Sequence, residues 1–313
     1  MIARSWLFVP GDSERKLARA ATSAADALIL DLEDSVARER LPEARVRVAA
    51  VLAGRPPGPG PQLWVRVNGA ATPEGLADLV AVMRGAPDGI VAPKVSSAQE
   101  IAQIHHFLSA LEAREGLELG ATRLLPIATE TARAVLGLDR LAAAAGAEPA
   151  APLGAPSIRR RLAGLTWGAE DLAAQVGALA NASPDGTLAP VFELARALCL
   201  VAAAAAGVPA IDGVHAEFRD RAGLERELAR ARRDGFAGKL AIHPDQIDAI
   251  NAAFTPSESE LAQARRIVAA FAAAPGLGVA SLDGRMIDRP HRIRAERLLA
   301  AAAELAREPS RRG

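Results

Sequence analysis

Eight short hydrophobic runs recur along this chain, and nearly every one ends in polar residues. Longer stretches rich in alanine, leucine, arginine and glutamate separate them. Such alternation indicates buried parallel strands connected by helices. Eight units of this kind predict a (β/α)8 TIM barrel, an α/β fold that carries its chemistry at the carboxyl ends of the strands. The runs cover residues 5–12, 27–34, 63–68, 89–94, 124–130, 162–171, 209–215 and 239–244.

The stretches between the runs predict helices and two notable loops. Thr72 can cap one helix, and Pro73 fits the first helical position, where no N–H is needed. The Pro/Ala-rich loop 146–160 precedes a strand, so we expect it on the face opposite the chemistry, with the arginines 159–161 in solvent. The loop 181–187 follows a strand and can overhang the site. The expected helices cover residues 13–25, 38–53, 73–84, 97–114, 131–145, 190–206, 222–234 and 258–273.

Length and composition favour a soluble, cytoplasmic protein over several other classes of protein. The chain has 37 Lys and Arg against 37 Asp and Glu, which argues against nucleic acid or an anionic membrane as its main partner. The one cysteine, Cys199, lies in an apolar run and is expected to be a buried, inert thiol. No run has the length and apolarity of a signal or membrane-spanning segment. We expect a catalytic barrel over residues 1–275 and a C-terminal lid and helix over 276–313.

Acidic residues follow the fifth and sixth runs. Glu130 ends one run, and Glu170 and Asp171 follow the next. Because adjacent strand ends converge on one pocket of a barrel, these carboxylates can jointly hold a divalent cation, and oxygen ligands suit Mg²⁺. The alternative is that they only stabilise the first turn of the following helix.

Charged residues also end the second, third and fourth runs. Asp31 and Glu33 share one face of a strand and have either a direct or a supporting role. Arg66 interrupts an apolar strand, which suits either a clasp for a substrate carboxylate or an ion pair with Glu33 or Glu130. Lys94 beside these acids is expected to balance their charge rather than to form a Schiff base.

Two other positions have alternative interpretations. Arg15 and Lys16 at the first helix start favour an anionic group such as a phosphate. His243, which ends the eighth run, is either a base or a hydrogen-bonded structural residue. His105 and His106 lie within an expected helix and are predicted to be surface residues.

Taken together, the motifs RSWLFVPGD, LILDLEDSV, WVRVNG, VAPKV, PIATET, LTWGAEDLA, AIDGVHAEFRD, DGFAGKLAIHPDQI and FTPS resemble the citrate lyase beta-subunit-like family. This family belongs to the HpcH/HpaI aldolase superfamily and includes malyl-CoA and citramalyl-CoA lyases. The resemblance runs in order from about residue 4 to residue 300. It implies a Mg²⁺-dependent TIM barrel (Mn²⁺ being an alternative ion) that assembles into homotrimers or homohexamers.

The resemblance also assigns roles to single residues. Glu130 and Asp171 match the metal ligands, and Arg66 matches the arginine that binds the carboxylate of the keto-acid portion. Arg15 and Lys16 match the region that contacts the CoA nucleotide. The tail motif DGRMID resembles a lid whose aspartate, Asp288 here, reaches a neighbouring subunit's site as an acid or base.

These matches predict reversible cleavage of an acyl-CoA thioester such as malyl-CoA or citramalyl-CoA. The products would be acetyl-CoA or propionyl-CoA and a 2-keto acid, either glyoxylate or pyruvate. Three alternatives stay open: a malyl-CoA thioesterase or malate-synthase-like enzyme, a citrate lyase subunit acting on a carrier-protein thioester, and an inactive scaffold. The sequence does not specify the alkyl substituent of the substrate or the role of the loop 146–160.

Overall fold

In the computed structural model, which describes residues 3–146, 157–273 and 278–307, eight parallel strands form one sheet. Their order is β5-β4-β3-β2-β1-β8-β7-β6. The end strands β5 and β6 are joined by the bridges Leu124↔Leu162 and Ile127↔Thr166, so the sheet closes on itself. The predicted TIM barrel is therefore confirmed. The strands are β1 (Ser5–Pro10), β2 (Ala27–Asp31), β3 (Gln62–Arg66), β4 (Gly89–Ala92), β5 (Arg123–Pro126), β6 (Leu165–Thr166), β7 (Ala210–Asp212) and β8 (Gly238–Ala241).

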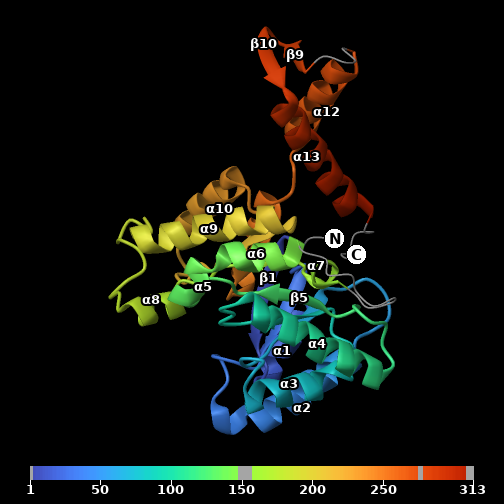
Figure 1. Cartoon of the computed structure of the whole chain (residues 1–313), viewed down its shortest axis with the longest axis vertical. Helices are drawn as coiled ribbons and strands as arrows, with labels where there is room; N and C mark the ends of the chain where they lie inside the picture. The colour runs from blue at the N-terminus through green and yellow to red at the C-terminus, as the bar shows by residue number, and fades with distance from the viewer. Residues whose placement is uncertain (1–2, 147–156, 274–277, 308–313) are drawn as a thin grey trace. The chain divides into compact units, whose positions relative to one another are not determined.

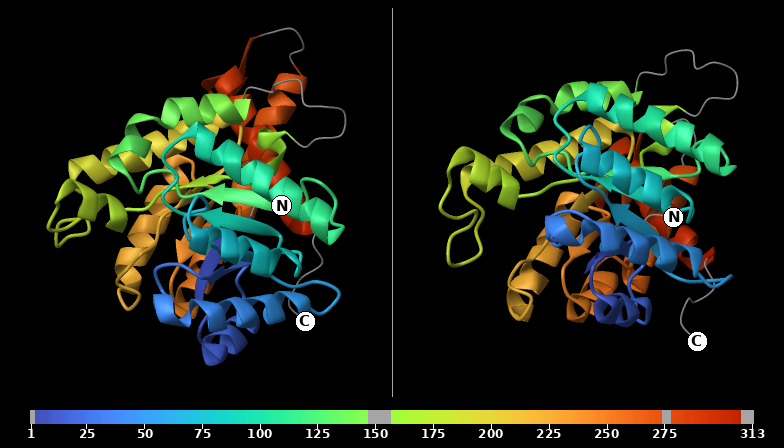
Figure 2. Two further views of the ribbon diagram at one scale, coloured as in Figure 1. Left: turned by 60° about the horizontal axis from the view of Figure 1, so that its bottom comes forward. Right: turned by 90° about the horizontal axis from the view of Figure 1, so that it is seen from below.

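Helices surround the strands of the barrel (Figure 1, Figure 2). Thr72 caps α3 as predicted, because its hydroxyl accepts a hydrogen bond from the Gly75 N–H at 3.1 Å. The helix expected over 131–145 is divided at Gly137 into α5 and α6, and α7, α8 and α11 are additional short helices. The helices are α1 (Glu14–Ala21), α2 (Leu41–Ala53), α3 (Pro73–Met83), α4 (Ala98–Glu115), α5 (Ala132–Leu136), α6 (Leu138–Gly146), α7 (Ile158–Arg161), α8 (Glu170–Val176), α9 (Pro190–Ala206), α10 (Arg221–Asp234) and α11 (Ile247–Ala253), with the 3-10 turns η1 (Arg38–Arg40) and η2 (Pro244–Gln246).

Two tryptophans fill the interior of the barrel. Trp6 and Trp64 meet edge to face, with ring centroids 4.9 Å apart. Gly89 on the next strand makes room for them, since a Cβ atom there would lie 2.2 Å from the Trp64 ring. The interior is thus packed with side chains and is not a channel, which leaves the strand ends as the place for a site.

A buried arginine lies on the face opposite the strand ends, where the sequence predicted a solvated one. Arg161 is 1% exposed, and its guanidinium donates to both oxygens of Glu112 at 2.8 and 2.9 Å. Its Nε donates to Nδ1 of His105, which is also buried, so the surface predictions for Arg161 and His105 are wrong. The arginine joins α4 to α7 at the end of the loop 146–160, of which residues 147–156 lie outside the described residues.

The C-terminal segment forms a hairpin between two helices. Asp283 and Gly284 both have positive φ, at 52° and 73°, as a two-residue hairpin turn requires. An ion pair between Arg266 and Asp283 attaches the hairpin to the preceding helix. The elements are α12 (Glu258–Ala272), β9 (Val279–Leu282), β10 (Arg285–Asp288) and α13 (Arg289–Arg307).

The chain divides into two compact units, Ile2–Asn251 and Ala252–Gly313. The first is the barrel, and the second contains α12, the hairpin and α13. The predicted lid boundary at residue 276 stays a prediction, since residues 274–277 lie outside the described ones. Among the described residues, no helix combines the length and the apolarity needed to cross a bilayer.

Candidate active site

An arginine and an aspartate face each other at the mouth of the barrel. Arg66 and Asp31 occupy paired positions of β3 and β2, and Nε and Nη2 of Arg66 donate to the two oxygens of Asp31 at 2.7 and 2.6 Å. Burial would raise the pKa of Asp31, but the hydrogen bonds and charge of Arg66 hold it below its ordinary value. A guanidinium has five N–H groups, so these two bonds leave donors on both Nη atoms of Arg66.

Other contacts orient the same guanidinium. Its Nη1 lies 3.0 Å from Oε2 of Glu33, and its Cζ lies 4.7 Å from the ring centroid of Phe8. The ion pair with Glu33 was one of the two alternatives that the sequence offered for Arg66. The closer pair with Asp31 was not among them.

Lys94 contacts several acidic residues, and its backbone has an unusual conformation. Its φ of 53° is unusual for a residue with a side chain, and its backbone N–H donates to Glu130. Its ammonium contacts Glu33 and lies 3.2 Å from Asp34 and 3.3 Å from Asp171. Lys94 therefore balances the charge of the acids, as expected from the sequence.

Glu130 is a buried carboxyl whose charged form is disfavoured. It is 5% exposed, and burial together with the nearby charge of Asp171 raises its pKa to about 8, although the Lys94 N–H opposes this shift. Its side chain fits against Gly168, where a Cβ atom would lie 2.8 Å from Cγ of Glu130. A cation at this point would favour the ionised carboxylate.

The donor set suits a hard divalent cation with several water ligands. Among the described residues, no group of three or more His, Cys, Asp or Glu side chains is arranged to hold a metal. Glu130 and Asp171 offer oxygen ligands from two neighbouring parts of the barrel mouth, and Mg²⁺ is commonly held by one or two carboxylates with water and substrate oxygens. The residues present therefore fit such an ion.

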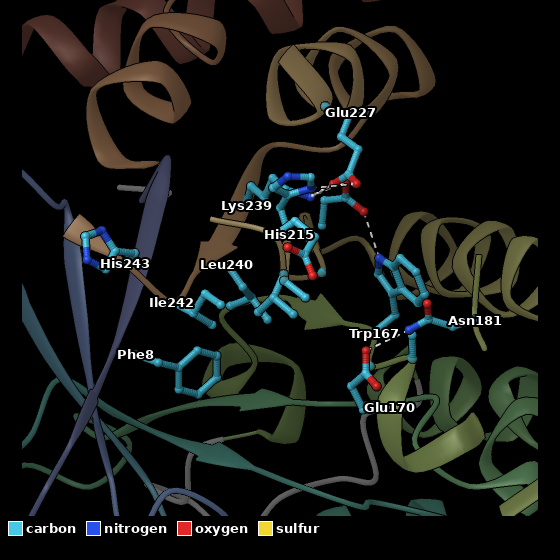
Figure 3. A pocket seen from close by; sticks show the side chains of 18 of the residues that line it. Phe8, Trp167, Glu170, Asn181, His215, Glu227, Lys239, Leu240, Ile242 and His243 are labelled. Atoms are coloured by element: carbon cyan, nitrogen blue, oxygen red, sulfur yellow. Dashed lines mark hydrogen bonds and ion pairs between the residues drawn. The ribbon is translucent and has the colours of Figure 1, made fainter. Parts of the chain in front are cut away.

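A single large cavity connects these residues. Its volume is about 1160 Å³, enough for a ligand larger than a simple keto acid. The loop 181–187 lines it, as predicted, and Asn181 donates to Glu170 at 2.7 Å (Figure 3). The predicted site residues that line this cavity are Arg15, Lys16, Asp31, Arg66, Glu130 and Asp171.

The sequence interpretation missed a buried ionic cluster in the cavity wall. Asp212 accepts from Nε1 of Trp167 at 2.7 Å and from Nε of Arg196 at 3.0 Å, and Lys239 lies 3.3 Å from it. Burial would raise the pKa of Asp212, but Lys239 and Arg196 hold it below its ordinary value. In the sequence, the signal for this cluster was the charged residue in each of the seventh and eighth runs, Asp212 and Lys239. The cluster fixes Trp167 in the wall (Figure 3).

Two further predicted residues have defined local contacts. His243 accepts a hydrogen bond from the Asp245 N–H at 3.2 Å and caps η2, which agrees with the structural alternative. Asp288 ends β10 in the second compact unit, and its hydrogen bond to His291 lowers the pKa of Asp288. Asp288 is therefore in its ionised form at neutral pH.

Comparison with known proteins agrees with this geometry. A family model described as HpcH/HpaI aldolase/citrate lyase matches residues 4–244. The chain belongs to this family. Among curated family members, it is 36% identical to a (3S)-malyl-CoA thioesterase of Cereibacter sphaeroides, over 97% of this chain and 95% of the relative. It is 37% identical to the citrate lyase subunit beta of Escherichia coli, over 97% and 94% of the two chains.

A solved family structure has the same fold. Protein CitE from Mycobacterium tuberculosis, in complex with magnesium, acetoacetate and coenzyme A, superimposes with a TM-score of 0.72 at 33% identity. The match covers 96% of this chain and 98% of CitE. The family inferred from the motifs is thus confirmed, while the roles of single residues in this HpcH/HpaI protein stay proposals.

Proposed function

We propose that this protein is a Mg²⁺-dependent carbon–carbon lyase that acts reversibly on a 3-carboxy-3-hydroxyacyl-CoA such as malyl-CoA or citramalyl-CoA. The observation that carries the proposal is one cavity that contains both the Arg66–Asp31 pair and the carboxyls of Glu130 and Asp171. A carboxylate clasp beside a cation site suits a 2-hydroxy acid, which offers both a carboxylate and a hydroxyl. The names of relatives, malyl-CoA thioesterase and citrate lyase subunit beta, support this substrate class.

Glu130 and Asp171 would hold the magnesium ion, which the related CitE structure also contains. When bound, such an ion supplies Lewis-acid polarisation of the hydroxyl and carboxylate oxygens of the substrate. Gly168 keeps the Glu130 side chain against the end of β6, and Lys94 holds its other side through the backbone N–H. These contacts present Glu130 to the cavity in one orientation.

Arg66 would bind the substrate carboxylate through its Nη atoms and keep the bond to be broken in place. In the cleavage direction the hydroxyl gives its proton to solvent water and becomes the carbonyl of glyoxylate or pyruvate. The electron pair of the carbon–carbon bond passes to the α-carbon of the thioester, which then takes up a proton to give acetyl-CoA or propionyl-CoA.

We assign the proton transfer at that carbon to Asp288 of a neighbouring subunit, in a trimer or hexamer whose lids are exchanged. His291 lowers the pKa of Asp288 and keeps it ionised, the form that removes the α-proton in the condensation direction. In the cleavage direction the protonated form of Asp288 would return that proton.

A direct assay tests the proposal. Purified protein is mixed with malyl-CoA or citramalyl-CoA, and released glyoxylate or pyruvate is measured with and without EDTA. We expect keto acid that depends on added Mg²⁺ and falls strongly in Asp288→Asn. Full turnover in EDTA, or unchanged turnover in the variant, would contradict the mechanism.

Hydrolysis of the thioester is a second candidate, because one family relative is named a malyl-CoA thioesterase. Free CoA appearing together with malate, measured with a thiol reagent, distinguishes this outcome from cleavage to acetyl-CoA. A carrier-protein substrate, as for a citrate lyase subunit, would show as turnover only with the acylated carrier. An inactive scaffold would show no turnover. A scaffold role does not require the buried charged groups around Arg66 and Glu130, so their presence argues against it.

A further inference from the structure

Lys94 has a backbone conformation that residues with side chains rarely adopt. Its φ of 53° lies in the left-handed region, where the Cβ atom of an L-residue crowds its own backbone. Glycine would occupy this position without that cost. Strain of this kind persists only where the surrounding structure compensates for it, and it is common at functional sites. A lysine at this position therefore indicates that its side chain contributes more than the strain costs.

Two groups of Lys94 contact the acids at the mouth of the barrel. Its backbone N–H donates to Glu130, and its ammonium contacts Glu33. The ammonium also lies 3.2 Å from Oδ2 of Asp34 and 3.3 Å from Oδ2 of Asp171. One residue thus contacts four carboxyls, and two of these, Glu130 and Asp171, are the proposed ligands of the magnesium ion.

The ion pair between Lys94 and Asp171 is partly hydrated. Glu130 and Asp171 belong to the wall of the cavity, where a cation from solution can reach them. The side chains of Lys94 and Asp171 are 38% and 31% exposed, whereas those of Arg66 and Asp31 are 12% and 1% exposed. A partly hydrated pair separates at a much lower cost than a buried one. The ammonium can therefore give way to another cation.

A divalent cation held by Glu130 and Asp171 would carry a charge of the same sign as the ammonium of Lys94. Cations that share a carboxylate repel each other, and the repulsion is strong where the wall of a cavity replaces part of the water. Without any cation, however, the carboxyls around Lys94 would repel one another. Lys94 therefore stabilises the acids before the ion binds and opposes the ion when it binds.

We propose that the Lys94 ammonium competes with Mg²⁺ for Asp171 and so lowers the affinity of the site for the ion. The inference rests on the proposed function, because it takes Glu130 and Asp171 as the metal ligands. Removal of the ammonium should then have two effects of opposite sign, a less stable protein without the ion and tighter binding of the ion. A lysine that only supports the fold would lack the second effect, and one that only orients Asp171 would reverse it.

Magnesium binding without substrate gives the first test. Mg²⁺ is titrated by calorimetry into the full-length protein, the variant Lys94→Met and the control Arg114→Met, which removes the cation of the Arg114–Glu115 pair on α4. We expect Lys94→Met to bind Mg²⁺ about tenfold more tightly and to melt at a lower temperature in EDTA than the unmodified protein. The control should bind Mg²⁺ as the unmodified protein does. Equal or weaker Mg²⁺ binding by Lys94→Met would overturn the inference.

The lysine signals of the unmodified protein give a second test, which decides the inference even where Lys94→Met does not fold. The chain has three lysines, Lys16, Lys94 and Lys239. Protein labelled with ¹³C at lysine Cε is titrated with Mg²⁺ and followed by NMR, and the Lys94 signal is the one that Lys94→Arg lacks. We expect this signal to shift as Mg²⁺ binds. The signal of Lys239, which is buried beside Asp212, should stay in place.

The two tests separate failure of the inference from failure of the proposed function. A Lys94 signal that does not change while Mg²⁺ binds would overturn the inference and leave the metal site intact, as would equal affinity of Lys94→Met and the unmodified protein. If the unmodified protein binds no Mg²⁺ in either experiment, the proposed metal site itself is wrong, and the inference is overturned with it.

Discussion

Asp31 and Arg66, at paired positions of adjacent strands, form a two-pronged ion pair in which both carboxylate oxygens accept from the guanidinium. Asp31 is 1% exposed, so the pair is withdrawn from water at the edge of the cavity. A buried pair of this kind fixes the orientation of the guanidinium. Removing only one partner strongly destabilises the fold, because the other charge is left buried without a counter-charge.

Asp31→Asn should therefore destabilise the barrel and loosen Arg66 together. We expect the free energy of unfolding to fall by about 3 kcal/mol, because Arg66 loses its main buried counter-charge. The variant should also raise KM for the acyl-CoA more than it lowers kcat, because Arg66 is still present but is no longer held in position by Asp31. Urea denaturation and steady-state kinetics measure the two effects. Glu225→Gln, which breaks the exposed Arg221–Glu225 pair, is the control and should change stability by less than about 0.5 kcal/mol.

The contact between Gly168 and Glu130 gives a prediction about metal affinity. In Gly168→Ala the added methyl would lie 2.8 Å from Cγ of Glu130, so the carboxyl must move. We expect the melting temperature without metal to change little and the stabilisation by Mg²⁺ to be largely lost. For comparison, an ion at 100 times its Kd adds about 2.7 kcal/mol of stability. Thermal melts over a Mg²⁺ series measure this difference.

Gly69→Ala is the matched control for that substitution. Its new methyl would lie 3.6 Å from Thr72, an ordinary contact, so its response to Mg²⁺ should match that of the unmodified protein. If Gly168→Ala kept the full Mg²⁺ response, Glu130 would not be a ligand in the proposed way.

The sequence predicted the barrel and most of its mouth because both depend on local patterns. Apolar runs that end in acids pointed to Glu130 and Asp171, and Arg66 stood out as a charge inside an apolar run; all three residues line the cavity. Contacts that depend on register or on distant segments were not predictable. Register places Arg66 opposite Asp31, and Arg161 becomes buried because its partner Glu112, 49 positions away, folds against it.

The low pKa of the buried His105 should make the stability of the protein depend on pH. Burial and the charge of Arg161 lower its pKa to about 4 from an ordinary value of about 6.5. The unfolded chain therefore takes up a proton first as the pH falls. The contribution of neutral His105 to stability is complete above about pH 6.5 and is lost between there and about pH 4.

His105→Asn tests this dependence because its amide oxygen can still accept from Arg161 while it has no proton to gain. Between pH 7 and pH 4 the unmodified protein should lose about 2 kcal/mol more stability than the variant. His106→Asn, at the exposed neighbouring position, should keep the pH profile of the unmodified protein. Chemical denaturation at several pH values measures the profiles, and identical slopes for all three proteins would contradict the prediction.

Mixing two inactive variants tests whether Asp288 serves a neighbouring chain. Asp288→Asn keeps a complete barrel mouth, and Glu130→Gln keeps an intact lid, so neither alone should turn over substrate appreciably. If the lid is exchanged, unfolding and refolding the two together in equal amounts should restore about one quarter of the normal activity, because random assembly pairs an intact mouth with an intact lid at that frequency. Each variant refolded alone is the control. A mixture no more active than these controls would show that each Asp288 acts within its own chain or has no part in the reaction.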